Sequence, residues 1–193
     1  MINYFSLGIL VLIFGTSFFL RGRPFRFKFY RFVFWSSFIL IFCWSFFQTF
    51  ILYNQWEKNA IAKFLIPPYE NINYFIFYSG IEFFAPFIIS LFFALLFFFF
   101  AKKLNKKNNE CFFEPEEPYL GAMALFLTSH PGWLFYFIVI LFVYLFIHIY
   151  SLFFIHKSSF RIPLYYLWIP VGIFVIIIQR FLELLPLWNL LKI

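Results

Sequence analysis

The sequence predicts an all-α protein, a polytopic helical bundle in a membrane, and two observations carry that prediction. Of its 193 residues, 64% are hydrophobic and only 12% are charged, whereas a soluble domain is typically about 25% charged. The apolar residues, 38 Phe among them, also gather in stretches of about 20, the helix length that crosses about 30 Å of hydrocarbon. Such a chain cannot cover its surface with polar groups in water, so the bilayer has to be its solvent.

We expect a single integral membrane domain over residues 1–193, with five long transmembrane helices and one short crossing or re-entrant helix. The predicted long spans cover residues 3–20, 32–53, 74–100, 133–155 and 165–187, and the short segment covers residues 118–130. The first span precedes its positive charges and lacks a small-residue cleavage site. It therefore reads as a retained helix rather than a signal peptide.

Positive charge in the connectors predicts the orientation. Residues 21–31 carry five positive charges and no negative charge, and four lysines lie at 102–107, after the third long span. Cytoplasmic loops carry an excess of Lys and Arg, so we expect both connectors in the cytoplasm and the N-terminus outside. The expected membrane is a bacterial inner membrane or, alternatively, an organellar inner membrane.

The short segment, residues 118–130, decides between two topologies. With five crossings, Lys157 and Arg161 fall outside, against the charge rule, whereas a sixth crossing returns them to the cytoplasm. A helix of this length covers only about 20 Å, so it must be shielded by its neighbours or re-enter. We favour six membrane segments, with a helical hairpin over residues 118–155 whose tip is His130-Pro131-Gly132.

Glu116 and Glu117 precede the short segment and form a candidate acidic pair at the membrane face. Carboxylates at a helix N-terminus are stabilised by its dipole, by about 0.3–1 kcal/mol. Gly121, Ala122 and Ala124 then permit close packing of the two hairpin arms. A paired-carboxylate acid–base site is one interpretation. Capping plus a tight helical hairpin explains the same residues, so we assign no catalytic residue.

Glu82 and His148 form a candidate intramembrane polar site. Glu82 lies about nine residues into the third long span and four residues before Pro86, whose ring kinks a helix and frees a carbonyl. Because a carboxyl in hydrocarbon is costly, we expect Glu82 to face the bundle interior. His148 lies within a later span, where it pairs with Glu82 or relays protons, or else bonds a neighbouring hydroxyl or carbonyl.

Several classes of site have no signature in the sequence. The chain contains no Asp, and Cys43 and Cys111 do not have the spacing of metal ligands. We therefore predict no cofactor and no metal site. Nucleic-acid binding requires basic groups on the solvated face of a folded domain, and we expect none. The expected partners are the lipid bilayer and other membrane protein subunits.

Residues 113–178 resemble the C-terminal half of prepilin peptidases, the type IV leader peptidases. The matching pieces, in the family's order of a short small-residue helix, a long span, a basic loop and a proline-bearing last span, are LGAMALFLTSHPGW, the span to Ile155, HKSSFRIP and LYYLWIPVGIFVII. Glu116-Glu117-Pro118 stands where the family has Gly-Asp, and the chain has no Asp to complete a catalytic dyad. The resemblance therefore implies a relative that has lost aspartyl protease activity.

Three functions remain open at this point. The favoured one is a non-catalytic polytopic membrane protein that is a component of a membrane assembly. The second is a proton- or ion-coupled transport component that uses Glu82 and His148. The third is a divergent prepilin-peptidase-like membrane protein.

Overall fold

The computed structural model describes residues 4–19, 26–108, 112–154 and 164–191, which form helices and turns without a strand. The helices are α1 (Tyr4–Phe19), α2 (Arg26–Lys58), α3 (Ile72–Ser79), α4 (Ala85–Lys107), α5 (Glu117–Leu127), α6 (Gly132–Phe154), α7 (Tyr165–Leu182) and α8 (Pro186–Leu191). A 3-10 helix, η1 (Ala62–Leu65), precedes α3, and a π-helical segment, η2 (Gly80–Phe84), joins α3 to α4. The all-helical prediction is confirmed for the described residues.

Four helical runs are long and apolar enough to cross a membrane: Arg26–Lys58, Ile72–Lys107, Gly132–Ser151 and Tyr165–Leu182. They make the chain a multi-pass membrane protein. Five long spans are more than the structure contains in its described residues, because α1 has only 16 residues, a length of about 24 Å. A crossing by α1 stays a prediction.

The structure moves the ends of three predicted spans. The span predicted over 32–53 is α2, which is longer at both ends. The run Ile72–Lys107 passes through α3, η2 and α4 without a break and has 36 residues, a length of about 54 Å, so it extends well past the predicted 74–100. The predicted last span reaches residue 187, whereas α7 ends at Leu182 and Pro186 begins α8. Proline at 186 suits the first turn of a new helix, where its missing N–H is not needed.

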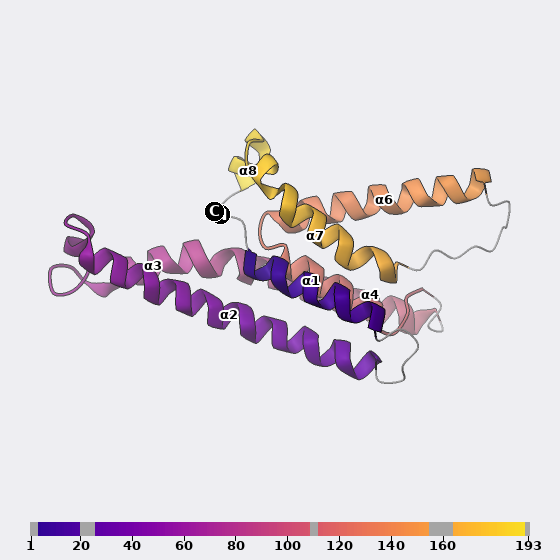
Figure 1. Ribbon diagram of the computed structural model, residues 1–193, viewed down its shortest axis with the longest axis horizontal. Coiled ribbons are helices and arrows are strands. Elements are labelled where there is room, and N and C mark those ends of the chain that lie inside the picture. The colour runs from indigo at the N-terminus through magenta and orange to yellow at the C-terminus, as the bar shows by residue number, and fades with distance from the viewer. Residues whose placement is uncertain (1–3, 20–25, 109–111, 155–163, 192–193) are drawn as a thin grey trace.

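Helix α5 lies at the centre of the bundle, and α1, α2, α4, α6 and α7 all contact it (Figure 1). Every side chain from Glu116 to Ser129 is buried. A helix that is apolar on all sides has to be covered on all sides, and α5 meets that condition although it is the shortest of the helices that the sequence predicts in the membrane.

The predicted hairpin tip is confirmed, but the predicted packing of its arms is wrong. Helix α5 ends at Leu127 and α6 begins at Gly132, yet α5 packs chiefly on α4 and α7 rather than on α6. A Cβ atom at Gly121 would lie 2.7 Å from a ring carbon of Phe97 in α4 and 3.0 Å from Trp168 in α7. The small residue therefore admits large aromatic rings from these two helices. A small residue in a sequence does not indicate which helix will pack against it.

The chain reversals bring basic side chains together at one end of the bundle. Helix α2 begins there, α4 ends there, and α5 and α7 begin there (Figure 1). We call it the basic end, defined by Arg26, Lys28, Arg31, Lys102, Lys103, Lys106 and Lys107. Lys157 and Arg161, which the sixth crossing is expected to return to this side, lie outside the described residues.

Candidate functional site

Glu117, at the start of α5, has only 2% of its surface exposed. Its carboxylate accepts two backbone hydrogen bonds, Oε1 from the N–H of Tyr165 at 2.8 Å and Oε2 from the N–H of Glu114 at 3.2 Å. Tyr165 begins α7, and the first N–H groups of a helix have no partner within it. Glu117 therefore caps α7 and fixes its start against the start of α5.

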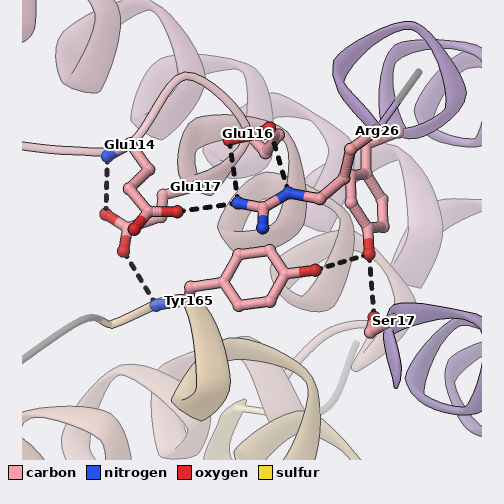
Figure 2. A network of polar contacts seen from close by, with 7 residues as sticks. Ser17, Arg26, Glu114, Glu116, Glu117 and Tyr165 are labelled. Atoms are coloured by element: carbon pink, nitrogen blue, oxygen red, sulfur yellow. Dashed lines mark hydrogen bonds and ion pairs between the residues drawn. The ribbon is translucent and has the colours of Figure 1, made fainter. Parts of the chain in front are cut away.

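Arg26, the first residue of α2, binds two further carboxylates (Figure 2). Its Nη2 lies 2.8 Å from Glu114 Oε2 and 3.3 Å from Glu116 Oε2, and its Nε lies 3.1 Å from Glu116 Oε1. The guanidinium also stacks over the Tyr165 ring, 4.4 Å from its centroid. Only a planar cation with several fixed donors can bind a carboxylate through two nitrogens and stack at once. Arg26 therefore joins α2 to α5 and α7.

A chain of hydroxyl groups extends this cluster toward α1. The Tyr165 and Tyr30 hydroxyls are 2.6 Å apart, Tyr30 donates to Ser17 at 3.0 Å, and Ser17 donates to the carbonyl of Ile13 at 2.8 Å. Because each hydroxyl has one proton, Tyr165 must be the donor to Tyr30. The chain of donors ends on a backbone carbonyl, so it holds α1, α2 and α7 together.

The end of α4 is fastened to the same region. The Lys102 ammonium donates to the Tyr119 hydroxyl at 3.1 Å. The Asn105 side chain accepts from the N–H groups of Phe112 and Phe113 and donates to the carbonyl of Phe113. These bonds fold the residues just before α5 back onto α4, which explains why α4 and α5 pack so extensively.

The bonding of the carboxylates matches the capping interpretation better than an acid–base pair. Both oxygens of Glu116 accept from Arg26, and both oxygens of Glu117 accept from backbone N–H groups. All of these donors stabilise the charged carboxylates. Within the described ranges, no group of three or more His, Cys, Asp or Glu side chains could hold a metal ion.

No protein-family model, no curated protein and no solved structure matches the chain. The function therefore has to be argued from the geometry. The resemblance to prepilin peptidases rests on the sequence alone.

The prediction that Glu82 faces the bundle interior is wrong, because its side chain is exposed on η2. The expected disruption near Pro86 is present as the π-helical segment, in which the N–H of Ala85 bonds the carbonyl of Gly80. The Ser45 hydroxyl donates to the carbonyl of Phe83 at 3.1 Å. A side chain of α2 thus satisfies a backbone group in this segment.

Glu82 and His148 are not brought together. His148 is exposed on α6, where its ring stacks on Tyr144 with the centroids 6.2 Å apart. The start of α6 lies near the start of α4, since the N–H of His130 donates to the carbonyl of Pro86 at 3.1 Å. His148 is 16 residues beyond Gly132, about 24 Å further along the helix, so it cannot pair with Glu82.

Sequence reasoning missed Arg26, Glu114 and Tyr165. Arg26 is one of five cations in residues 21–31, and nothing in the sequence distinguishes the one that turns inward. Tyr165 lies 48 residues from Glu117, so their contact depends on the tertiary fold. The only usable signal was the position of Glu116 and Glu117 before an apolar helix.

Proposed function

We propose that the chain is a non-catalytic multi-pass membrane protein that acts as a component of a membrane assembly. The observation that carries the proposal is the exposure of residues 141–150 of α6. From residue 141 to 150, only Val143 and Ile147 are partly buried, and the other side chains are exposed. Helices α6 and α7 lie close together near α8 and separate toward the basic end (Figure 1).

The exposed half of α6 carries polar groups among its apolar side chains. Tyr144 and His148 stack on each other, and both are exposed. Helices associate in lipid through close packing and through hydrogen bonds between polar side chains. An exposed helix that presents a hydroxyl and an imidazole beside Phe146 is therefore suited to contact a partner helix.

The buried carboxylates support a non-catalytic role. Glu116 and Glu117 are used in the bonds that hold α2, α5 and α7 together. The transport alternative uses Glu82 and His148, which the structure does not bring together, and we do not propose it further.

Photo-crosslinking tests the proposal. A photoreactive amino acid replaces Phe146 on α6 or, as a matched control, Phe32 on α2; each of these side chains is 72% exposed. Membranes of the organism that encodes the protein are irradiated, and adducts are separated by mass. We expect a discrete protein adduct from position 146 and none from position 32.

A lipid-facing α6 would give a different outcome. If positions 142, 146, 149 and 153 all fail to give a protein adduct, the exposed half of α6 faces lipid and the assembly role is rejected. If position 32 gives the same adducts as position 146, the contacts are collisional and the proposal fails as well.

A divergent prepilin-peptidase-like protein remains the alternative proposal. The order of the described elements supports it: a short helix α5, a long helix α6, and a last long helix α7 with Pro170 in its interior. Under this alternative, Glu116 should act on a substrate. Glu116→Gln and Arg26→Gln should then differ in phenotype. If the cluster is purely structural, the two variants should have the same phenotype.

A further inference from the structure

Two cations lie at the same level on the adjoining helices α2 and α4 at the basic end. The ammonium of Lys102 on α4 lies 4.3 Å from the centroid of the Phe98 ring, and Phe98 stacks on Phe34 of α2 with the centroids 5.1 Å apart. Lys102 is four residues after Phe98, and Arg31 is three residues before Phe34. Because the helices are antiparallel, both cations lie about 5 Å from this ring contact toward the basic end.

Helix geometry directs the two cations toward the same side of the α2–α4 seam, the line along which Phe34 of α2 meets Phe98 of α4. Seen along a helix axis, successive side chains point about 100° apart. Arg31 therefore points about 60° away from Phe34 on α2, and Lys102 points about 40° away from Phe98 on α4. In antiparallel helices these two rotations point to one side of the seam. Helix α5 lies on the other side, where Phe97 meets Gly121. Its Tyr119 reaches into the seam, where the ring packs on Phe34 and Phe98 and the hydroxyl accepts from the Lys102 ammonium. Both cationic side chains are exposed.

Among the described residues, no carboxylate neutralises these two cations. Neither Arg31 nor Lys102 forms an ion pair with an acidic side chain of the described residues. Glu114 and Glu116 bind Arg26 instead. Like charges at one level repel each other, and an anion placed between them removes the repulsion.

Helix length is compatible with a position of the two cations at the level of lipid phosphates. Lys102 is 20 residues after Glu82, which corresponds to about 30 Å of helix, the thickness of the hydrocarbon core. About one turn deeper, Trp35 of α2 and Phe99 of α4 are exposed, and their rotation of about 100° places them on the same side as the cations. Aromatic rings at this depth suit the region where headgroups meet acyl chains.

We propose that an anionic phospholipid binds on this side of the α2–α4 seam. Its phosphate lies between the Arg31 guanidinium and the Lys102 ammonium, and its acyl chains lie against Trp35 and Phe99. The guanidinium binds phosphate oxygens through two nitrogens, and the ammonium adds a point charge. A zwitterionic lipid carries its own cation, so it competes weakly with an anionic lipid here.

Native mass spectrometry of the chain from nanodiscs tests this site. The discs contain phosphatidylglycerol and phosphatidylcholine in equal amounts, and the ratio of the two lipids retained by the protein is measured. We expect the native chain to retain phosphatidylglycerol preferentially. Since a basic residue near an anionic surface contributes about 1 kcal/mol, Arg31→Gln with Lys102→Gln should reduce the preference about 10- to 30-fold.

The matched control removes the same charge from the other side of α4. Lys103 and Lys107 are exposed and point away from the seam, so Lys103→Gln with Lys107→Gln should keep the preference. An equal loss in both double variants would show general surface attraction and overturn the site. A native chain that retains both lipids alike would overturn it without any variant, even if the double variant does not fold. Displacement of the lipid by millimolar inorganic phosphate would show a free-phosphate site instead.

Discussion

At the scale of single residues, three neighbouring glutamates are held in three different ways. Glu114 is an outer partner of Arg26, with 45% of its side chain exposed, whereas Glu116 is an inner partner with 11% exposed. Glu117 accepts backbone N–H groups from two segments. Burial of a carboxylate is costly unless its oxygens accept hydrogen bonds. The two more buried carboxylates, Glu116 and Glu117, accept hydrogen bonds at both oxygens.

Glu117→Gln is expected to destabilise the protein more than the same change at Glu114. An amide keeps one acceptor oxygen and places an NH₂ group against a backbone N–H, so one buried donor loses its partner at a cost of about 1–3 kcal/mol. At the more exposed Glu114, water replaces the lost contact, and we expect less than about 1 kcal/mol. Thermal unfolding in detergent micelles measures the difference.

Hydrogen exchange identifies the cause of that change. In Glu117→Gln, exchange should speed up at whichever of the Tyr165 and Glu114 amides faces the new NH₂ group, while Glu114→Gln should leave the Tyr165 amide unchanged. If both variants unfold at the same temperature and both amides stay protected in Glu117→Gln, Glu117 does not cap α7.

The sequence predicted part of this cluster and not the rest. Glu116 and Glu117 were identifiable because carboxylates before an apolar helix have a known electrostatic effect. Arg26 was not, because a run of cations beside a span has the same composition whether its members face water, lipid or a buried carboxylate. The partner of a buried charge is decided by the packing of helices that are distant in sequence.

At the scale of the elements, α5 depends on the absence of a side chain at Gly121. The Phe97 and Trp168 rings meet over it, with their centroids 5.3 Å apart. A single methyl group there has to displace one ring or the other, and the Phe97 ring is also packed against Phe137.

Gly121→Ala is expected to lower the free energy of unfolding relative to Gly15→Ala. Overpacking at Gly121 costs about 1–3 kcal/mol, whereas Gly15 on α1 has nothing within 4 Å of an added Cβ and should gain up to about 1 kcal/mol of helix propensity. We expect the two variants to differ by about 2 kcal/mol in thermal unfolding. Equal midpoints would mean that α5 does not pack closely on α4 and α7.

Element boundaries followed from the sequence where Pro and Gly interrupt the helices, as at Pro131-Gly132. The lengths of the helices did not follow from the sequence. An apolar stretch has no sequence pattern that separates the part in the membrane core from the part beyond it. Counting from Tyr74 placed Glu82 deep in a span. The helix instead continues to Lys107, and Glu82 lies about one hydrocarbon thickness from Lys102.

At the scale of the whole molecule, α5 and its turn connect the two ends of the bundle. Glu117 lies at the basic end, and His130 contacts Pro86, which is 16 residues or about 24 Å from Lys102 along α4. Eleven helical residues and a short turn thus cover most of the roughly 30 Å of hydrocarbon. The neighbouring helices that surround α5 shield its polar ends from lipid.

This arrangement leads us to expect six crossings, with the basic end in the cytoplasm and the N-terminus outside. Positive charge is retained on the cytoplasmic side. All four cations of α4 lie at the basic end, as do all those of α2 except Lys58. In a background with Cys43 and Cys111 replaced by Ser, an impermeant maleimide should label Ile61→Cys in intact cells, because the Ile61 side chain is exposed near η1. Lys103→Cys should react only after permeabilisation, and a reporter fused after Ser159 should read as cytoplasmic. An external reporter combined with a protected Lys103→Cys would show that α5 re-enters rather than crosses, which leaves five crossings.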